Sequence, residues 1–118
     1  MAAEKTYIGE RTPLGLRVLV DDGETRALLE HHVRHSPTGF ECGYAGSGPS
    51  DLARCILIDH LDLHRAVRAD PEALLGVDYQ AFKFAVIAGL PRDEHWELPA
   101  ASVQKWIDNT QGETPDGQ

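Results

Sequence analysis

The stretch Ser36–Leu52, SPTGFECGYAGSGPSDL, and the apolar run Leu52–Leu63 that follows it decide the organisation of this chain. The stretch holds four of the eleven glycines and two of the seven prolines. Glycine is used where the backbone needs a positive φ or where another group approaches it closely. This density is typical of a tightly turned loop, and the apolar run after it predicts a helix.

The start of that helix is marked by Pro49, whose missing N–H costs nothing at the first helical position. With Ser47 or Gly48 as the N-cap, Asp51 would lie in the first turn, at the positive end of the helix dipole. A glycine-rich loop before a helix N-terminus offers free backbone N–H groups to an anion. The stretch is therefore either a structural turn or a ligand-binding loop.

The spacing of the glycines matches none of the common phosphate-binding motifs. It reads G-x-x-G-x-G, the reverse of the dinucleotide spacing, and no Gly-Lys-Ser/Thr follows. Asp51 would also repel a phosphate. A structural turn is the simpler interpretation, and the alternative is a small anionic-ligand or nucleotide binder, or an enzyme. For that alternative the candidate ligand-binding residues are Phe40, Tyr44, Gly46, Ser47 and Gly48.

Ser36–Ala53 resembles the core signature, close to SPTGFEWGYGGSGPAQLA, of a domain-of-unknown-function family of short bacterial and phage proteins. Weaker matches are Tyr7–Arg11, Tyr79–Lys83, and Trp96–Leu98 followed by Trp106, so the resemblance covers roughly residues 6–107. The chain departs from the signature at three positions. It has Cys42 where the signature has Trp, Ala45 where the signature has Gly, and Asp51 where the signature has Gln. The resemblance implies no catalytic residues.

Length and composition indicate one domain, residues 1–110, with a disordered polar tail at 111–118. The net charge of −8 disfavours binding to nucleic acid or to an anionic membrane, because both reward Lys and Arg. The start of the chain lacks an apolar signal segment. Two cysteines, Cys42 and Cys55, do not make a disulfide framework, so we expect reduced thiols and a cytoplasmic protein.

The N-terminal part predicts an antiparallel meander. We expect strands at Thr6–Gly9, at Leu16–Asp21, where apolar and polar residues alternate, and at Thr25–Leu29. Asp22-Gly23 is a strong hairpin signal. Trp96–Leu98 is a further candidate, at the edge of the sheet.

The rest of the chain predicts helices over Ser50–Arg68, Tyr79–Ala88 and a last segment that begins at Pro99. The run of apolar residues at 55–58 makes the first of these the central helix, covered on more than one side. The expected fold class is α+β, with a small meander of about three strands packed against about three helices.

Histidines and cysteines suggest weaker hypotheses. His60 and His64 are four residues apart on the expected central helix and could hold a transition metal together with Cys42, His35 or an aspartate. Cys42 and His35 could also form a nucleophilic pair, although a buried cysteine that serves as a small apolar residue is commoner. We expect no cofactor and no bound metal.

Glu41 lies between Phe40 and Cys42. If it is buried it needs a partner, and Arg11 or a loop N–H could serve.

The sequence is best explained by a non-enzymatic, acidic binding or accessory protein that acts by protein–protein contact. The resemblance to phage proteins adds the expectation of an inhibitor of a host defence system. An acidic protein can bind a basic surface by charge complementarity. The candidate partner-binding residues are Asp21, Asp22 and Glu24 on the hairpin and Asp93, Glu94 and Glu97 around Trp96.

Overall fold

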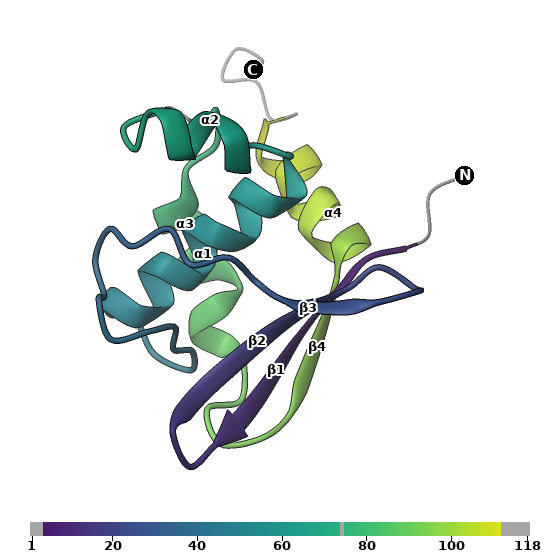
Figure 1. Ribbon diagram of the computed structural model, residues 1–118. Helices are drawn as coiled ribbons and strands as arrows, with labels where there is room; N and C mark the ends of the chain where they lie inside the picture. The colour runs from purple at the N-terminus through teal and green to yellow at the C-terminus, as the bar shows by residue number, and fades with distance from the viewer. Residues whose placement is uncertain (1–3, 74, 112–118) are drawn as a thin grey trace.

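A four-stranded antiparallel sheet forms one layer of the molecule, and the helices lie over one of its faces (Figure 1). The computed structural model describes residues 4–73 and 75–111. In these residues the fold is α+β, as the sequence predicts. The strand order is β3-β2-β1-β4, with the bounds β1 (Thr6–Thr12), β2 (Gly15–Asp21), β3 (Arg26–Leu28) and β4 (Trp96–Pro99).

The β2–β3 hairpin forms where Asp22-Gly23 predicts it, with a loop of residues 22–25. Gly23 has a φ of +95°, a conformation that favours glycine. The Asp22 N–H donates to the Thr25 carbonyl at 3.1 Å, and the Asp22 carboxylate accepts from the Glu24 and Thr25 N–H groups, each at 2.9 Å. Two strand lengths differ from the predictions: β1 is longer than predicted and β3 is shorter.

The predicted strand at Trp96 is confirmed as β4, an edge strand that pairs with β1. Its register places Trp96 beside Gly9. A Cβ atom at Gly9 would lie only 2.1 Å from Cε2 of the Trp96 ring, so this position in β1 requires glycine. The indole is buried and joins the core.

The helices come from the second half of the chain. Their bounds are α1 (Ser47–His60), α2 (His64–Ala69), α3 (Tyr79–Ala85), a 3-10 turn at Ile87–Gly89, and α4 (Ala100–Gln111). Helix α1 is central, as predicted, and its residues 48–58 are all buried. It packs between the sheet, α3 and α4.

The prediction of one helix over Ser50–Arg68 is wrong, because the chain turns between α1 and α2. Asp62 adopts a left-handed conformation with a φ of +59°. The Leu63 N–H donates to the Ile58 carbonyl at 2.8 Å and the Asp62 N–H to the Asp59 carbonyl at 3.1 Å. These two bonds are the Schellman helix ending, with aspartate in the place that glycine usually takes.

Two other helix boundaries differ from the predictions. Helix α1 begins at Ser47 with Gly46 as its N-cap, so Pro49 is its third residue and Asp51 lies beyond the first turn. The Asp51 carboxylate therefore does not face the helix dipole. Helix α3 ends at Ala85, and a 3-10 turn follows in place of the last α-helical residues predicted up to Ala88.

The predicted polar tail lies outside the described residues, except for Gln111, which ends α4. Among the described residues no helix has both the length and the apolar character needed to cross a membrane.

Candidate functional site

The segment 29–46 connects β3 to α1 without a helix or strand of its own. Side chains of α1 hold it in place. Asp51 is fully buried, and its carboxylate accepts the backbone N–H groups of Arg34 (3.2 Å), His35 (2.9 Å) and Ser36 (3.1 Å). His31 Nε2 lies 2.8 Å from the same carboxylate. Asp51 thus replaces the backbone partners that a strand would have supplied.

Arg54 and Cys55 fix the same segment one turn further along α1. The Arg54 guanidinium donates to the carbonyls of His32 (3.1 Å) and Pro71 (3.0 Å). The backbone N–H of His32 donates to the Cys55 sulfur at 3.3 Å. Burial raises the pKa of the Cys55 thiol to about 12, so this sulfur is a protonated structural group.

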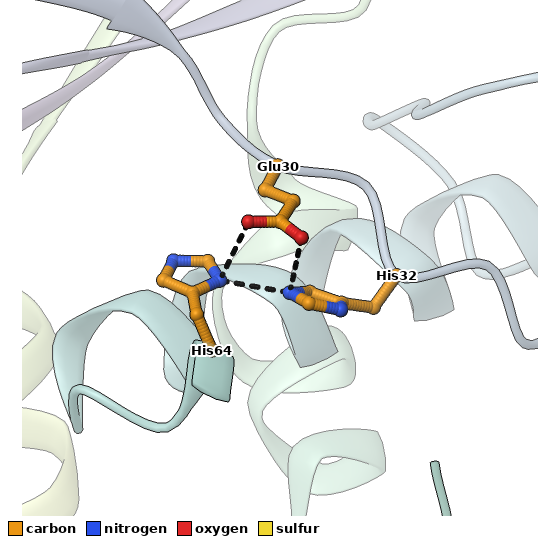
Figure 2. Close-up of side chains that lie close together, drawn as sticks. All are labelled: Glu30, His32 and His64. Atoms are coloured by element: carbon orange, nitrogen blue, oxygen red, sulfur yellow. Dashed lines mark hydrogen bonds and ion pairs between the residues drawn. The ribbon is translucent and has the colours of Figure 1, made fainter. Parts of the chain in front are cut away.

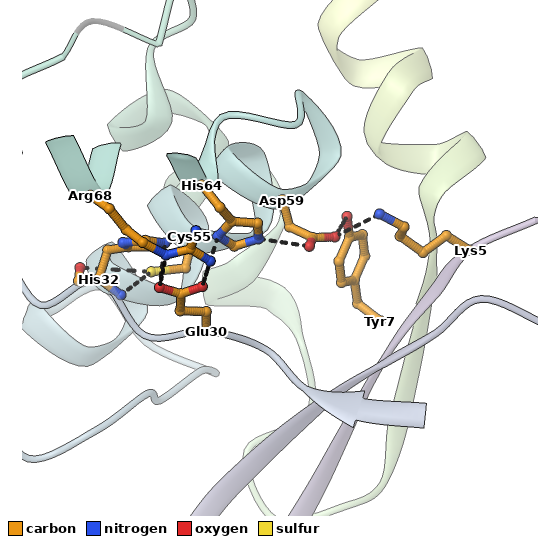
Figure 3. Close-up of polar contacts among 8 residues, drawn as sticks. All are labelled: Lys5, Tyr7, Glu30, His32, Cys55, Asp59, His64 and Arg68. Carbon is orange, nitrogen blue, oxygen red and sulfur yellow. Dashed lines mark hydrogen bonds and ion pairs between the residues drawn. The ribbon is translucent and has the colours of Figure 1, made fainter. Parts of the chain in front are cut away.

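A chain of polar contacts runs from the sheet through the α1–α2 turn to this segment (Figure 3). At its first end, Asp59 at the end of α1 accepts from Lys5 Nζ at 2.9 Å and from the buried Tyr7 hydroxyl at 2.8 Å. The other carboxylate oxygen of Asp59 lies 2.8 Å from His64 Nε2. Lys5 and Tyr7 therefore fix the carboxylate that meets the first residue of α2.

The other ring nitrogen of His64 meets His32 and Glu30 (Figure 2). His64 Nδ1 lies 2.8 Å from His32 Nε2. One carboxylate oxygen of Glu30 lies 3.6 Å from His32 Nε2, and its other carboxylate oxygen lies 3.6 Å from His64 Nδ1. The Arg68 Nε–H donates to Glu30 at 2.9 Å. Two histidines and one carboxylate thus converge at a half-buried place between the segment and α2.

The electrostatics of this cluster favour ionised carboxylates and a neutral His32. Burial alone would raise the pKa of Asp59, but hydrogen bonds from His64, Lys5 and Tyr7 outweigh it and hold that pKa below its ordinary value. The hydrogen bond from Arg68 lowers the pKa of Glu30. Burial lowers the pKa of His32, which favours the neutral imidazole.

The pairing of His60 and His64 on one helix is wrong, because the break at Asp62 places them on different elements. His60 Nε2 lies 2.7 Å from the side-chain oxygen of Gln104 on α4. His64 turns instead toward His32 and Glu30. Among residues 4–73 and 75–111, Glu30, His32 and His64 form the one group of three or more His, Cys, Asp or Glu side chains that lie close enough together to share a metal ion.

The pair predicted for Glu41 is confirmed. Arg11 Nη1 and Nη2 donate to the two carboxylate oxygens of Glu41 at 2.9 and 2.8 Å. This forked geometry is the strong form of an Arg–carboxylate pair. It ties β1 to the glycine-rich loop, and the Arg11 guanidinium also donates to the carbonyl of Arg92.

The glycine-rich loop packs closely on its own neighbours. A Cβ atom at Gly48 would lie 2.7 Å from the Cβ atom of Glu41, and one at Gly46 would lie 2.6 Å from the ring of Tyr44. The Arg92 guanidinium lies over the Tyr44 ring, 4.7 Å from its centre. Ser47 is exposed. The use of this loop as an anion site stays a prediction.

Cys42 and His35 do not meet. Cys42 is fully buried, and its thiol donates weakly to the Pro91 carbonyl at 3.5 Å. Burial raises the pKa of this thiol. His35 lies 2.8 Å from the Tyr79 hydroxyl. Cys42 is therefore a small core residue, in agreement with the commoner of the two interpretations.

An apolar groove of about 620 Å³ lies on the other side of the segment from the histidine cluster. The β1–β2 hairpin forms one wall through Leu14, Leu16 and Val18, and the end of β3 forms another. Phe40 and His31 close it from the segment, with their rings 4.3 Å apart. Leu14 is 99% exposed, although it borders the groove.

The candidate acidic residues fall into two separate groups. The first group is Asp21 at the end of β2 with Asp22 and Glu24 in the loop after it, and Asp21 accepts from the Arg26 Nε–H at 2.8 Å. The other three, Asp93, Glu94 and Glu97, lie on or just before β4. Because β3 and β4 are opposite edges of a four-stranded sheet, about 14 Å separates the edges.

A family model matches residues 7–109, and its description is "Family of unknown function (DUF6166)". The chain belongs to this family. No curated protein and no solved structure gives a significant match. DUF6166 membership agrees with the resemblance to a family of unknown function, and it assigns no activity to the residues described above.

Sequence reasoning missed Glu30 and His32 as partners of His64. A signal was available in the order Glu30-His31-His32. In an extended chain alternate side chains point the same way, so Glu30 and His32 share one side while His31 takes the other. The structure has this arrangement, with His31 beside the groove and Asp51, and His32 beside Glu30 and His64.

Proposed function

We propose that this protein is a non-enzymatic binding protein that takes an extended, apolar segment of a basic partner protein along the edge of β3. The observation that carries the proposal is the apolar groove at the end of β3, which Leu28 and Leu29 help to line. It extends the expectation of an acidic protein that acts by protein–protein contact.

The edge of β3 supports an added strand. All three residues, Arg26, Ala27 and Leu28, are exposed, and Leu28 is 67% exposed. Strand β3 pairs with β2 on one side, and among residues 4–73 and 75–111 no strand pairs with the other. An exposed strand edge presents unpaired N–H and C=O groups to which another chain can add.

The groove supplies the side-chain part of such recognition. In strand addition the main-chain bonds give affinity, and pockets for alternate side chains give specificity. The groove begins at the end of β3, where Leu28 and Leu29 line it. Its other apolar lining includes Leu16, Val18 and Phe40. A bound segment would cover Leu28 together with the fully exposed Leu14.

Charge distinguishes the partner. The chain carries a net charge of −8, and three acidic residues lie just before β3: Asp21 at the end of β2, and Asp22 and Glu24 in the loop. Asp21 and Asp22 hold the hairpin through their carboxylates, whereas the Glu24 side chain is exposed. A basic residue of the partner next to its apolar side chains would meet this turn. A phage origin would extend the proposal to an inhibitor of a host defence system.

The test is a selection of binding peptides from a random library, followed by NMR titration of the protein with the selected peptides. We expect sequences that alternate apolar residues and contain Lys or Arg, with shift changes at the amides of residues 14–18 and 26–29. Leu28→Lys should weaken binding more than about tenfold, as expected for a residue at the centre of an interface.

The matched control is Phe84→Lys, which changes another large exposed apolar residue that lies on α3, away from the groove. It should leave peptide binding unchanged. Shift changes that map elsewhere, or equal losses in the two variants, would contradict the proposal. A second copy of this chain could occupy β3 in place of a partner protein. Sedimentation of the protein alone tests this alternative, because such a copy would give a dimer that Leu28→Lys abolishes.

A further inference from the structure

The cluster of Glu30, His32 and His64 has the dimensions of a metal site. The two ring nitrogens are 2.8 Å apart, Glu30 Oε2 lies 3.6 Å from His32 Nε2 and Glu30 Oε1 lies 3.6 Å from His64 Nδ1, and one ligand atom from each residue can be chosen so that all three lie within 4.8 Å of one another. A separation of 3.6 Å is too long for a hydrogen bond, so the carboxylate bonds neither ring directly. An ion with bonds of about 2.0–2.2 Å to N and O holds neighbouring ligand atoms about 3–3.5 Å apart. A small separation of the two rings would complete this geometry.

Asp59 determines which nitrogen of His64 can bind an ion. Its carboxylate can only accept, and it already accepts from Lys5 and Tyr7. His64 Nε2 must therefore carry the proton and donate to Asp59, which leaves the lone pair on Nδ1. That nitrogen faces His32 and Glu30 (Figure 2). It accepts the 2.8 Å hydrogen bond from His32 Nε2, so an ion would replace the Nε2 proton, which passes to water or to His32 Nδ1. A carboxylate behind a ligating histidine is the usual support of such a ligand.

We propose that Glu30 Oε, His32 Nε2 and His64 Nδ1 bind one divalent transition-metal ion of the zinc type, and that Asp59 is a positioning residue for His64. Two imidazole nitrogens and one carboxylate oxygen suit Zn²⁺ and its first-row neighbours, whereas Mg²⁺ and Ca²⁺ prefer oxygen ligands alone. Three protein ligands leave a coordination position open for water.

The supporting contacts hold the ligands before an ion arrives (Figure 3). Arg68 orients Glu30, Cys55 bonds the backbone N–H of His32, and Asp59 fixes the ring of His64. These contacts come from α1, α2 and the segment, so the site depends on the folded chain. The positive charges of Arg68 and Lys5 lie nearby and repel a metal cation. We therefore expect weaker metal binding than at a site built from thiolates.

The experiment is calorimetric titration of the chelator-treated protein with Zn²⁺, together with the visible absorption of the Co²⁺ form. We expect one ion per chain. Asp59→Asn should weaken Zn²⁺ binding about 10–100-fold, and His64→Gln and Glu30→Gln, which remove ligands, should weaken it at least as much.

Two control variants make the result specific. His60→Gln removes a histidine near the same helix end that bonds Gln104 and takes no part in the cluster, so Zn²⁺ binding should not change. His95→Gln removes an exposed histidine that lies 3.2 Å from Glu97 and outside the cluster, so it too should retain the wild-type affinity.

Circular dichroism verifies that each variant is folded. If His64→Gln is unfolded, Glu30→Gln tests the proposal in its place. The Glu30 side chain is 40% exposed, so this change leaves the core intact. The proposal is overturned if the wild-type protein binds neither Zn²⁺ nor Co²⁺, if Glu30→Gln binds Zn²⁺ as the wild type does, or if His60→Gln loses as much affinity as the ligand variants.

Discussion

Replacing Asp51 with asparagine tests how the long segment before α1 is held. The two carboxylate oxygens accept four hydrogen bonds, three from backbone N–H groups and one from His31. Asparagine has nearly the same shape, but it keeps a single acceptor oxygen. Its NH₂ group would face at least one of the four donors, which would lose its partner inside the protein.

The size of the effect follows from these contacts. A hydrogen bond to a charged group contributes about 1.5–3 kcal/mol, and leaving a buried donor unpaired costs about 1–3 kcal/mol. One bond is lost and three are made to a neutral acceptor, so we expect Asp51→Asn to lower the free energy of unfolding by at least about 3 kcal/mol. With a urea dependence of about 1–3 kcal/mol/M, the midpoint should fall by about 1 M or more.

Urea unfolding followed by circular dichroism measures this change, with the exposed Asp93→Asn as the control that should have no effect. Hydrogen exchange should show faster exchange at the amides of Arg34, His35 and Ser36. A loss below about 1 kcal/mol, or unchanged protection of these amides, would refute the reasoning that Asp51 organises the segment.

The pH dependence gives a second measurement of the same carboxylate. Burial would raise the pKa of Asp51, but hydrogen bonds from His31 and from three backbone N–H groups outweigh it and hold that pKa below its ordinary value of 3.8. The contribution to stability is therefore fully present above pH 3.8 and is lost as the pH falls through the lower pKa of the folded protein. The difference between the wild type and Asp51→Asn should shrink in that acidic range.

Three further changes test the fold. Gly9→Ala should lower the free energy of unfolding by about 1–3 kcal/mol or more, because the new Cβ atom would overlap the Trp96 ring, and an unchanged urea midpoint would contradict that packing. Asp62→Gly should raise it by about 1 kcal/mol by relieving the left-handed conformation, and a decrease in the melting temperature would count against the proposed helix ending. Cys42 and Cys55 are fully buried with raised pKa values, so a thiol reagent should modify them only on unfolding, and fast labelling of the native protein would show that one of them is accessible.

Local patterns in the sequence predicted the elements that depend on local chemistry. The alternation at residues 16–21 and the turn residues Asp22-Gly23 require no distant contact, and both predictions are confirmed. The sequence also names Arg11 as one of two possible partners of Glu41, the other being a loop N–H, and the structure has the pair with Arg11.

The wrong predictions concern features that depend on one backbone dihedral angle and on contacts between residues far apart in the sequence. The predicted pair of His60 and His64 assumed a continuous helix, and the left-handed Asp62 ends that helix without a glycine or proline to signal it. The sequence assigns Asp51 to the helix dipole because it predicts a helix that starts later than α1 does. Its real partners are backbone groups of Arg34, His35 and Ser36, which no side-chain pattern reveals.

His31 and His32 are neighbours in the chain, and the extended backbone between them sends their rings to opposite sides. One ring borders the groove and the other belongs to the histidine cluster. An occupant that displaces the backbone at one of these histidines also displaces the peptide bond that the two residues share. Occupancy of the groove and of the cluster would then be linked, and by thermodynamic reciprocity each would change the affinity of the other by the same factor.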